Sequence, residues 1–578
     1  MKQPLLSIEN LSVDFKNDDT ITHTLDNISV TVNKGEVVAI VGESGSGKSV
    51  TALSVLQLLQ TPPAIYTNGK IIFYNNELET DLLRLSQKEM ENIRGNLIAM
   101  IFQEPMTSLN PVQTCGQQVT EAIILHKKSN HDKAKAQTLS LFKEVRLPVP
   151  ETIYKRYPHE ISGGQKQRVM IAMAMCCNPQ LLICDEPTTA LDVTVQKNIL
   201  LLIRNLQQQH NMSVIFISHD LGVVSEIADK IIVMYKGKIA EQGVTKDILN
   251  KPQHVYTKAL LACRPALHQK GERLPVVSDF IHDDKQPVAS PQQEGIDPQP
   301  VTPNLSDFKQ SRPLEIIIKV DHLKVWYPSQ KTLLGKVTAC NKAVDDVSFE
   351  IYKGEMLGLV GESGCGKTTL GRALLGLIQP TKGEIFFKNK DITKATGHEL
   401  RTIRKDMQIV FQDPYSSLNP RKKIGEAIAE PLKVHKLFAT DKQRKEKVIE
   451  LLEKVNLSAH HYNRYPHEFS GGQRQRIVIA RALALEPSFV VCDESVSALD
   501  VSVQAQVLNL LNDLKKEFDF TALFISHDLS VIRYISDRIM VMNKGVIEET
   551  GTAEEIYDHP QKEYTKQLIA SIPGIIPV

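Results

Sequence analysis

The sequence predicts an α/β protein of two similar domains, each built around a mainly parallel sheet, and three observations support this fold class. First, a set of short motifs occurs twice in the same order, 319 residues apart at Gly42 and Gly361 and 308 residues apart at His219 and His527. Second, near-continuous apolar runs end at these motifs, as parallel strands covered on both faces do. Third, a glycine-rich segment in each half separates an apolar run from a helical pattern. Repetition in fixed order indicates two homologous units of about 260 residues.

Length, composition and charge exclude several classes of protein. The 578 residues exceed one ordinary domain, and 42% hydrophobic with 23% charged residues is typical of soluble globular domains. The 68 Lys and Arg residues balance 67 Asp and Glu residues, so the net charge of +1 argues against a surface that binds nucleic acid over its whole extent. No window holds the ~18 to 20 consecutive apolar residues of a membrane-spanning helix, and the start lacks a secretory signal pattern. Eight cysteines without a Cys-x-x-Cys pair indicate a reducing compartment, by default the cytoplasm.

The motif pairs define the domain boundaries. Residues 41–49, 101–105, 156–165 and 216–220 recur as residues 360–368, 410–414, 464–473 and 524–528. Between the two sets, residues 283–313 carry six prolines and few large apolar residues, which is typical of a semi-extended linker. We therefore predict a first domain at residues 1–265, a proline-rich linker at 266–313 and a second domain at 314–578.

The elements of the first half follow from periodicity. The expected strands of the central sheet are the apolar runs at residues 36–41, 181–184 and 213–217. Helical patterns at residues 50–59 and 169–177 each stop at a proline-containing segment. Residues 230–243 predict a hairpin that turns near Gly237, and residues 538–551 are its counterpart in the second half.

Two P-loop patterns carry the most specific chemistry. Residues 42–49 and 361–368 both read Gly-x4-Gly-Lys followed by Ser or Thr. In this pattern the glycines let backbone amides approach phosphates, the lysine places a positive charge at the β- and γ-phosphates, and the hydroxyl ligates Mg²⁺. A single match can be a solvated glycine turn, but two matches in register, each between an apolar run and a helical pattern, favour phosphate binding.

Acidic pairs and a serine-glycine motif complete the phosphate chemistry. The pairs Asp185-Glu186 and Asp493-Glu494 end apolar runs, where the first acid can hold Mg²⁺ and the second can orient or deprotonate water. The sequence Ser-Gly-Gly-Gln at residues 162–165 opens a helical pattern, so its amides and the helix dipole suit a γ-phosphate. An ordinary helix N-cap is the alternative for that motif when it stands alone.

In these motifs each half resembles the ATP-binding domain of the ABC (ATP-binding cassette) family. The resemblance covers nearly all of the chain outside the linker. It implies a P-loop NTPase fold with a mainly parallel sheet core, an antiparallel β subdomain and a helical subdomain in each half. It further implies that the two domains of the chain sandwich two ATP molecules head to tail, so that each P-loop faces the Ser-Gly-Gly-Gln motif of the other domain. Residues 190–192 and 498–500 would lie at that interface.

The resemblance also assigns site residues. The catalytic residues would be Glu186, His219, Glu494 and His527. The metal ligands for Mg²⁺ would be Ser49, Gln103, Asp185, Thr368, Gln412 and Asp493. The ATP-binding residues would be Phe15, Gly42, Glu43, Ser44, Gly45, Ser46, Gly47, Lys48, Ser49, Gln103, Ser162, Gly163, Gly164, Gln165, Tyr327, Gly361, Glu362, Ser363, Gly364, Cys365, Gly366, Lys367, Thr368, Gln412, Ser470, Gly471, Gly472 and Gln473. Phe15 and Tyr327 would stack on adenine, with Trp326 as a rival for the second position.

Segments outside the ATP motifs resemble one branch of the family, the peptide and nickel importers. The segments are residues 102–111 and 411–420, together with His-Val-Tyr-Thr at 254–257 and a partial match at 563–565. This branch implies two transmembrane permease subunits, an external solute-binding protein and a place on the cytoplasmic face of the inner membrane, peripheral to it. Gln103 and Gln412 would link the nucleotide state to the permeases. The expected solute is a di- or oligopeptide, and no nucleic acid is expected as a partner.

Two alternatives remain open at this point. Soluble tandem ABC ATPases that act on ribosomes or nucleic acid also lack membrane spans, but they tend to carry charged interdomain helices, whereas this linker is rich in proline. A nucleotide-binding scaffold without hydrolysis is disfavoured because both halves keep the acid pair and the histidine.

Overall fold

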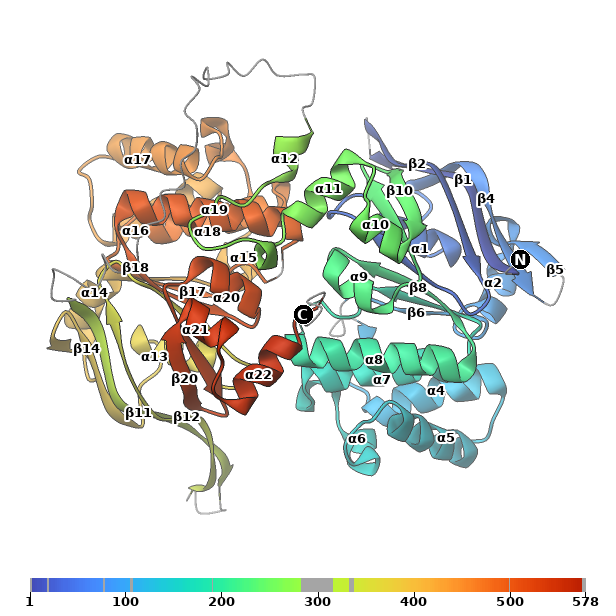
Figure 1. Ribbon diagram of the computed structural model, residues 1–578, viewed down its shortest axis with the longest axis horizontal. Helices are drawn as coiled ribbons and strands as arrows, with labels where there is room; N and C mark the ends of the chain where they lie inside the picture. Colours follow the sequence, from blue (N-terminus) through green and yellow to red (C-terminus); the bar gives the residue numbers. More distant parts are fainter. Residues whose placement is uncertain are drawn as a thin grey trace.

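The computed structural model describes residues 3–17, 20–75, 78–103, 108–189, 191–281, 315–331, 337–497 and 499–573. They form two domains that lie side by side, the first in blue to green and the second in yellow to red (Figure 1). The proline-rich stretch at 283–313 and two residues of the expected interface loops, Ala190 and Ala498, lie outside the described residues.

The first domain contains two sheets. The six-stranded sheet has the order β10-β9-β3-β8-β7-β6, formed by β3 (Val37–Val41), β6 (Ile98–Ile101), β7 (Leu181–Asp185), β8 (Ser213–Ser218), β9 (Lys230–Tyr235) and β10 (Lys238–Val244). Its strands are parallel except β10, which forms the predicted hairpin with β9. The antiparallel sheet has the order β2-β1-β4-β5, formed by β1 (Pro4–Asn17), β2 (Thr20–Asn33), β4 (Ala64–Asn75) and β5 (Leu78–Asp81).

Helices surround these sheets. In the first domain they are α1 (Lys48–Val55), η1 (Leu82–Arg84), α2 (Gln87–Ile93), α4 (Cys115–Lys127), α5 (His131–Glu144), α6 (Pro150–Lys155), η2 (Pro158–Glu160), α7 (Gly163–Met175), α8 (Val193–His210), α9 (Leu221–Ile227), α10 (Thr245–Asn250), α11 (Val255–Ala262), η3 (Pro265–Leu267) and α12 (Val277–Phe280). Helices α4 to α7 pack on one another as the helical subdomain.

The second domain repeats this arrangement. Its six-stranded sheet has the order β16-β17-β18-β13-β19-β20, formed by β13 (Met356–Val360), β16 (Met407–Val410), β17 (Phe489–Asp493), β18 (Thr521–Ser526), β19 (Arg538–Asn543) and β20 (Val546–Thr552). Its antiparallel sheet has the order β12-β11-β14-β15, formed by β11 (Ile316–Lys331), β12 (Val337–Tyr352), β14 (Lys382–Phe387) and β15 (Lys390–Asp391). Its helices are α13 (Lys367–Leu374), α14 (Gly397–Asp406), α15 (Pro414–Ser417), α16 (Ile424–Val434), α17 (Asp441–Lys454), η4 (Ala459–Asn463), η5 (Pro466–Glu468), α18 (Gly471–Leu483), α19 (Val501–Phe518), α20 (Leu529–Ile535), α21 (Ala553–Asp558) and α22 (Glu563–Ala570).

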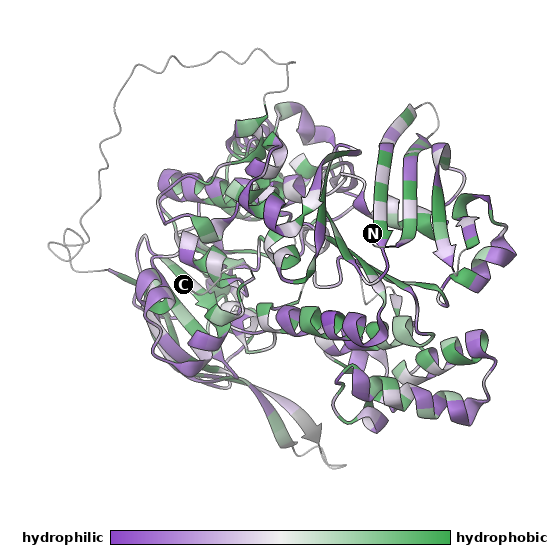
Figure 2. Ribbon diagram, turned by 45° about the vertical axis from the view of Figure 1, so that its right-hand side comes forward, coloured by the Kyte–Doolittle hydropathy of each residue, from purple (hydrophilic) through white to green (hydrophobic). Residues whose placement is uncertain are grey.

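Strand order explains why the motifs meet. Strand β8 lies between β3 and β7, and all three are parallel, so their carboxyl ends share one edge of the sheet. The first P-loop follows β3, the acid pair ends β7 and His219 follows β8. The three strands are buried along their whole length, which their continuous apolar runs predict. Figure 2 shows hydrophobic residues along these strands and mixed polarity on the surrounding helices.

One predicted element ends early. The helix expected at residues 50–59 is α1, which begins within the P-loop at Lys48 and ends at Val55. The next turn breaks because Gln57 adopts a left-handed φ of 48° and the Leu58 N–H donates to the Leu53 carbonyl. Such a reversal satisfies carbonyls that the last helical turn leaves free.

Residues 265–281, which we call the crossing segment, pack on the second domain although they follow the first. Within this segment η3 contacts α20, and the Asn509 side chain on α19 binds both backbone groups of Leu274. The Leu274 N–H donates to Asn509 Oδ1 over 3.0 Å, and Asn509 Nδ2 donates to the Leu274 carbonyl over 2.8 Å. Leu201, at the matching position of α8 in the first domain, is 51% exposed. The predicted linker at 266–313 thus begins with residues that are built into the domain interface.

Two other hydrogen bonds join the first domain to the last described residues of the second. Lys197 Nζ of α8 donates to the Ala570 carbonyl over 2.7 Å, and Arg264 Nη2 donates to the Pro573 carbonyl over 3.1 Å. None of the helices in the described ranges is long and apolar enough to span a membrane.

We predict that Asn509→Ala loosens the crossing segment. The buried N–H and carbonyl of Leu274 lose their partners, which costs about 2 kcal/mol or more. Amide exchange within residues 265–281 should therefore accelerate about 30-fold, measured by hydrogen–deuterium exchange of the full chain.

The matched control is Leu201→Ala, which trims an exposed side chain at the equivalent helix position. It should change the stability by less than about 0.5 kcal/mol and leave the crossing segment protected. Equal exchange of residues 265–281 in both variants would show that Asn509 does not anchor the segment.

Candidate active sites at the domain interface

Both P-loops have the backbone needed to cradle phosphates. A Cβ atom on Gly42 would lie 2.3 Å from the Met234 carbonyl oxygen, and Gly47 has a φ of 101°. The corresponding values are 2.1 Å from the Met542 carbonyl oxygen for Gly361 and a φ of 113° for Gly366. Only glycine fits such positions without strain, and it keeps the loop amides accessible.

Each P-loop lysine folds back onto its own loop. Lys48 Nζ donates to the carbonyls of Gly42 over 2.7 Å and Glu43 over 2.9 Å, and it is buried. Lys367 Nζ makes the same two contacts in the second loop, to Gly361 and Glu362, at 2.7 and 2.9 Å. Each lysine ammonium group is therefore held by two loop carbonyls. Phosphate oxygens, which carry a full negative charge, can replace these carbonyls as its partners.

A hydroxyl and a carboxylate meet beside each loop. Ser49 Oγ donates to Asp185 Oδ1 over 3.1 Å, and Thr368 Oγ1 donates to Asp493 Oδ1 over 3.0 Å. Burial raises the pKa of Asp185 to about 6, although the Ser49 hydrogen bond opposes this rise, and burial likewise raises the pKa of Asp493. A paired hydroxyl and carboxylate fit Mg²⁺, which prefers oxygen ligands and usually takes one or two of them from the protein.

Glu186 is the centre of a hydrogen-bonded cluster. Its Oε2 accepts from Gln103 Nε2 over 3.1 Å and from Thr189 Oγ1 over 2.9 Å, and it lies 3.3 Å from His219 Nδ1. Burial alone would raise the pKa of Glu186, but the hydrogen bond and charge of His219, with the charge of Lys48, bring it down to about 2. Burial lowers the pKa of His219, and the bond to Glu186 outweighs this and raises it. Glu186 is thus ionised at neutral pH and held by a histidine that its own charge helps to protonate.

The second domain repeats the cluster with one change. Glu494 Oε2 accepts from Gln412 Nε2 over 2.7 Å and lies 3.4 Å from His527 Nδ1. Burial opposes ionisation of Glu494, but the bond to His527 lowers its pKa overall. Ser497, which replaces Thr189, donates to the Glu494 carbonyl instead of its carboxylate.

Both glutamates share an unusual backbone. Glu186 and Glu494 each have a φ of 47°, a left-handed conformation that costs energy outside glycine. Their N–H groups donate to the carbonyls of Ile217 and Ile525 on the neighbouring strands, over 3.1 and 3.0 Å. The substitution of Ser495 for Pro187 leaves this conformation unchanged, so the strand ends present both carboxylates alike.

A cavity of about 320 Å³ lies against the second P-loop. Its lining includes Lys367, Gln412, Glu494 and His527, and Tyr327 from β11, which is 40% exposed. Trp326 does not line it, since its indole Nε1 donates to Asp345 over 3.2 Å. In the first domain, Phe15 packs partly buried against the core of the β subdomain.

The domains contact each other head to tail. The Ser44 N–H of the first P-loop donates to Asp500 Oδ2 over 2.7 Å, and the Ser363 N–H of the second donates to Asp192 Oδ2 over 3.4 Å. The cavity beside the second P-loop therefore includes Asp192 of the other domain. The expected interface loops meet the opposite P-loops in both directions.

The Ser-Gly-Gly-Gln motifs begin helices α7 and α18 but stand apart from the P-loops. The Ser162 hydroxyl accepts from the Gln165 N–H over 3.3 Å, and the same cap joins Ser470 to Gln473. Of the described residues, those lining the second P-loop cavity do not include residues 162–165. The structure thus brings the P-loop, acid pair, glutamine and histidine together within each domain. The residues of the two Ser-Gly-Gly-Gln motifs are exposed or half-buried, except Gly472, which is buried.

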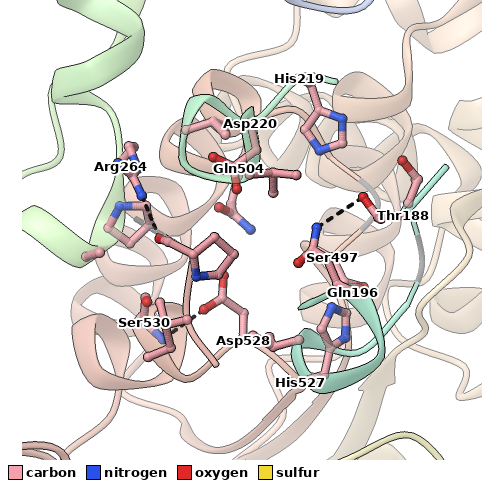
Figure 3. Close-up of a pocket in the computed structure, with 18 of the residues that line it drawn as sticks. Thr188, Gln196, His219, Asp220, Arg264, Ser497, Gln504, His527, Asp528 and Ser530 are labelled. Carbon is pink, nitrogen blue, oxygen red and sulfur yellow. Dashed lines mark hydrogen bonds between the residues drawn. The ribbon is translucent and has the colours of Figure 1, made fainter. Parts of the chain in front are cut away.

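A smaller cavity of about 130 Å³ lies between the two histidines. Figure 3 shows His219 and His527 on opposite sides of it, with Asp220 and Asp528 beside them and Arg264 bonded to Pro573. The two histidines therefore face a shared interdomain space.

Sequence reasoning missed several residues that support these sites. They are Thr189, Tyr256 and Tyr564, together with Thr194 and Ser502, which bond to the opposite P-loop. The signal for the two tyrosines was available, because the Tyr-Thr pair recurs in both halves at 256–257 and 564–565.

Comparisons with known proteins identify the family of this chain. The ABC transporter family matches residues 25–189 and 344–497, and the family described as oligopeptide/dipeptide transporter, C-terminal region, matches residues 240–279 and 548–577. The glutathione import ATP-binding protein GsiA of Shigella sonnei (strain Ss046) is 46% identical over 575 residues, which cover 98% of this chain and 89% of that protein. The protein of the same name from Escherichia coli (strain K12) has the same identity and coverage. Among solved structures, the dimeric ATP-binding cassette MJ0796 bound to ADP and Pi is 28% identical, with a TM-score of 0.37 over 41% of this chain and 99% of that chain. The resemblance expected from the motifs is confirmed, and the chain belongs to the ABC transporter family as an ATPase with two ATP-binding domains.

Proposed function

We propose that this chain is the ATPase subunit of an importer of di- or oligopeptides, with glutathione as the first solute to test. The observation that carries the proposal is the oligopeptide/dipeptide transporter region at the end of each domain, at residues 240–279 and 548–577. The names of relatives that match over 98% of the chain support it further. The solute itself would be selected by other subunits, because ABC ATPase domains of one fold serve several transport tasks.

In the proposed hydrolysis step, Glu186 and Glu494 orient the attacking water and accept its proton. Their ionised carboxylates suit this role, and the histidines that hold them would also contact the γ-phosphate. Lys48 and Lys367 would exchange their loop carbonyls for the β- and γ-phosphates of ATP. The phosphates would then lie on the glycine-loop amides at the start of α1 and α13.

Ser49 with Asp185, and Thr368 with Asp493, would hold Mg²⁺ in the two sites, with Gln103 and Gln412 close by. The ion, when bound, neutralises charge on the β- and γ-phosphate oxygens. Burial raises the pKa of both aspartates because it disfavours their charged forms, and a bound cation would oppose this effect.

Closure of the domains would complete each site. The hydrogen bonds that the Ser44 and Ser363 N–H groups donate to Asp500 and Asp192 support this head-to-tail arrangement. Bound ATP would draw the amides at the start of α18 and α7 onto the γ-phosphates of the opposite domain. Adenine would stack on Phe15 in the first site and on Tyr327 in the second.

Permease subunits would receive this motion near Gln103 and Gln412. An apolar side chain is exposed next to each glutamine, with Phe102 42% exposed in the first domain and Phe411 36% exposed in the second. Exposed apolar side chains next to a glutamine that donates to the glutamate of the site suit a partner surface that senses the nucleotide state. Two permeases and an external solute-binding protein would place the chain peripherally on the cytoplasmic face of the inner membrane.

We predict that both sites hydrolyse ATP. Glu186→Gln and Glu494→Gln should each lower steady-state phosphate release at least about 10-fold, because coupled sites fail when either loses its base, and such groups contribute ~10²- to 10⁴-fold. Phosphate release by the purified chain, or by its complex with permeases, measures this.

The matched control is Thr189→Ser, which keeps a hydroxyl near Glu186 and copies the residue of the second site. Its rate of phosphate release should stay within about 3-fold of that of the unmodified chain, since the hydroxyl only donates a hydrogen bond to Glu186. Full activity of Glu494→Gln together with an inactive Glu186→Gln would reduce the chain to one hydrolytic site.

The transport role predicts specific partners. A tagged chain isolated from solubilised membranes should carry two different permease subunits, and uptake of labelled glutathione or a dipeptide should require the chain. The Glu186→Gln/Glu494→Gln variant should still bind the permeases while uptake is abolished. Recovery of ribosomes without any permease would favour the soluble ATPase class instead.

A further inference from the structure

Each P-loop is held by a tyrosine from the C-terminal part of its own domain. The Glu43 N–H donates to the hydroxyl of Tyr256 over 3.0 Å, and the Glu362 N–H donates to the hydroxyl of Tyr564 over 3.1 Å. Glu43 and Glu362 are the second residues of the two P-loops. Two domains that differ at many other positions therefore make the same bond.

The tyrosines are fixed in place by their surroundings. Tyr256 lies on α11, is fully buried and packs on Tyr235 with ring centroids 4.3 Å apart. The start of α11 is anchored by Glu241, which accepts from the Gln253 and His254 N–H groups over 2.8 and 3.1 Å.

The second domain uses the same construction. Glu549 on β20 accepts from the Gln561 and Lys562 N–H groups over 2.8 and 3.2 Å, at the start of α22, which carries Tyr564. Burial raises the pKa of Tyr256 and of Tyr564, so both phenols stay protonated and accept the N–H without competing charge.

The P-loop glutamates join three parts of the molecule. The backbone carbonyl of Glu43 accepts from Lys48, and its carboxylate accepts from Ser502 at the start of α19 in the other domain. Glu362 likewise accepts from Lys367, and its carboxylate accepts from Thr194 on α8 over 2.8 Å. A tyrosine that fixes this residue therefore fixes the phosphate-binding lysine and the interdomain contact as well.

We propose that Tyr256 and Tyr564 are positioning residues for nucleotide binding, through which the C-terminal region of each domain sets the conformation of its P-loop. The bond keeps the unliganded loop in the conformation that binds phosphates, and it acts equally on bound ATP and on the transition state. Its role is therefore in affinity rather than in the chemical step. The inference rests on the assignment of the two P-loops as ATP sites.

The test is Tyr256→Phe, which keeps the ring and its packing and removes only the hydroxyl. The Glu43 N–H then lacks its hydrogen-bond partner, and an unpaired donor near the loop disfavours the conformation that binds phosphates. We expect the Kd of the first site for Mg-ADP to rise about 5- to 10-fold, measured by calorimetric titration of the full chain. Tyr564→Phe should weaken the second site equally, and the KM for ATP should rise in both variants with kcat within about 2-fold.

Tyr534→Phe is the matched control. The Tyr534 hydroxyl is also bonded, donating to the Glu272 carbonyl over 2.7 Å, and its side chain is buried. Its hydrogen-bond partners, Glu272, Asn509 and Asn512, belong to neither P-loop. This variant should keep both Kd values, and thermal unfolding of all three variants shows whether they are folded.

The outcomes separate the inference from its basis. If the unmodified chain binds Mg-ADP at two sites and both phenylalanine variants, folded, bind it equally well, the positioning role is overturned. A loss confined to kcat would also overturn it, because the tyrosines would then act on the chemical step. If the unmodified chain binds no Mg-ADP, the assignment of the P-loops fails and the inference fails with it.

Discussion

Reciprocal hydrogen bonds between an aspartate of one domain and the P-loop of the other set the arrangement on which both sites depend. Asp192 caps α8 through the Val195 N–H, over 2.8 Å, while its second oxygen accepts from Ser363 in the opposite P-loop. Asp500 makes the corresponding contact to Ser44. One carboxylate thus joins a helix terminus to the phosphate loop across the interface, and a helix N-terminus favours that negative charge. Because the contact runs in both directions, each P-loop is linked to the helix terminus of the other domain.

The two halves share their chemistry and differ in what surrounds it. The ionised Glu186 and Glu494, their histidines and their left-handed backbone are the same in both. The differences lie at the margins: Thr189 bonds to the carboxylate of its glutamate and Ser497 to the carbonyl, and Asn509 receives the crossing segment where the first domain has an exposed Leu201. The two domains thus keep the same catalytic groups, and the second binds the crossing segment that follows the first domain.

Sequence reasoning predicted the elements that carry periodic or motif signals and could not predict contacts between distant segments. Continuous apolar runs predicted β3, β7 and β8, and the sheet order then brought P-loop, acid pair and histidine to one edge. Nothing local to Leu274 indicates that it pairs with Asn509, because that bond depends on how the domains meet. The Tyr256 hydrogen bond was hidden for a similar reason: spacing places a tyrosine on a helix but does not say which loop it reaches. The positive φ of Glu186 is also a product of the strand end and its neighbours, not of residue type.

We propose that two ATP sites form within one chain, each from the P-loop of one domain and the Ser-Gly-Gly-Gln motif of the other. Cross-linking between these two parts distinguishes this arrangement from pairing between chains. Ser44→Cys and Gly471→Cys would be combined with Glu186→Gln, Glu494→Gln and Cys340→Ser, which removes an exposed thiol; a Cβ at Gly471 has open space around it. A protease site inserted within residues 283–313 then separates the halves. In the presence of Mg-ATP, a bifunctional thiol reagent should link the two halves. Before cleavage the linked protein should have the size of a single chain. Cross-links that form only between chains, or no cross-link with Mg-ATP, would contradict it.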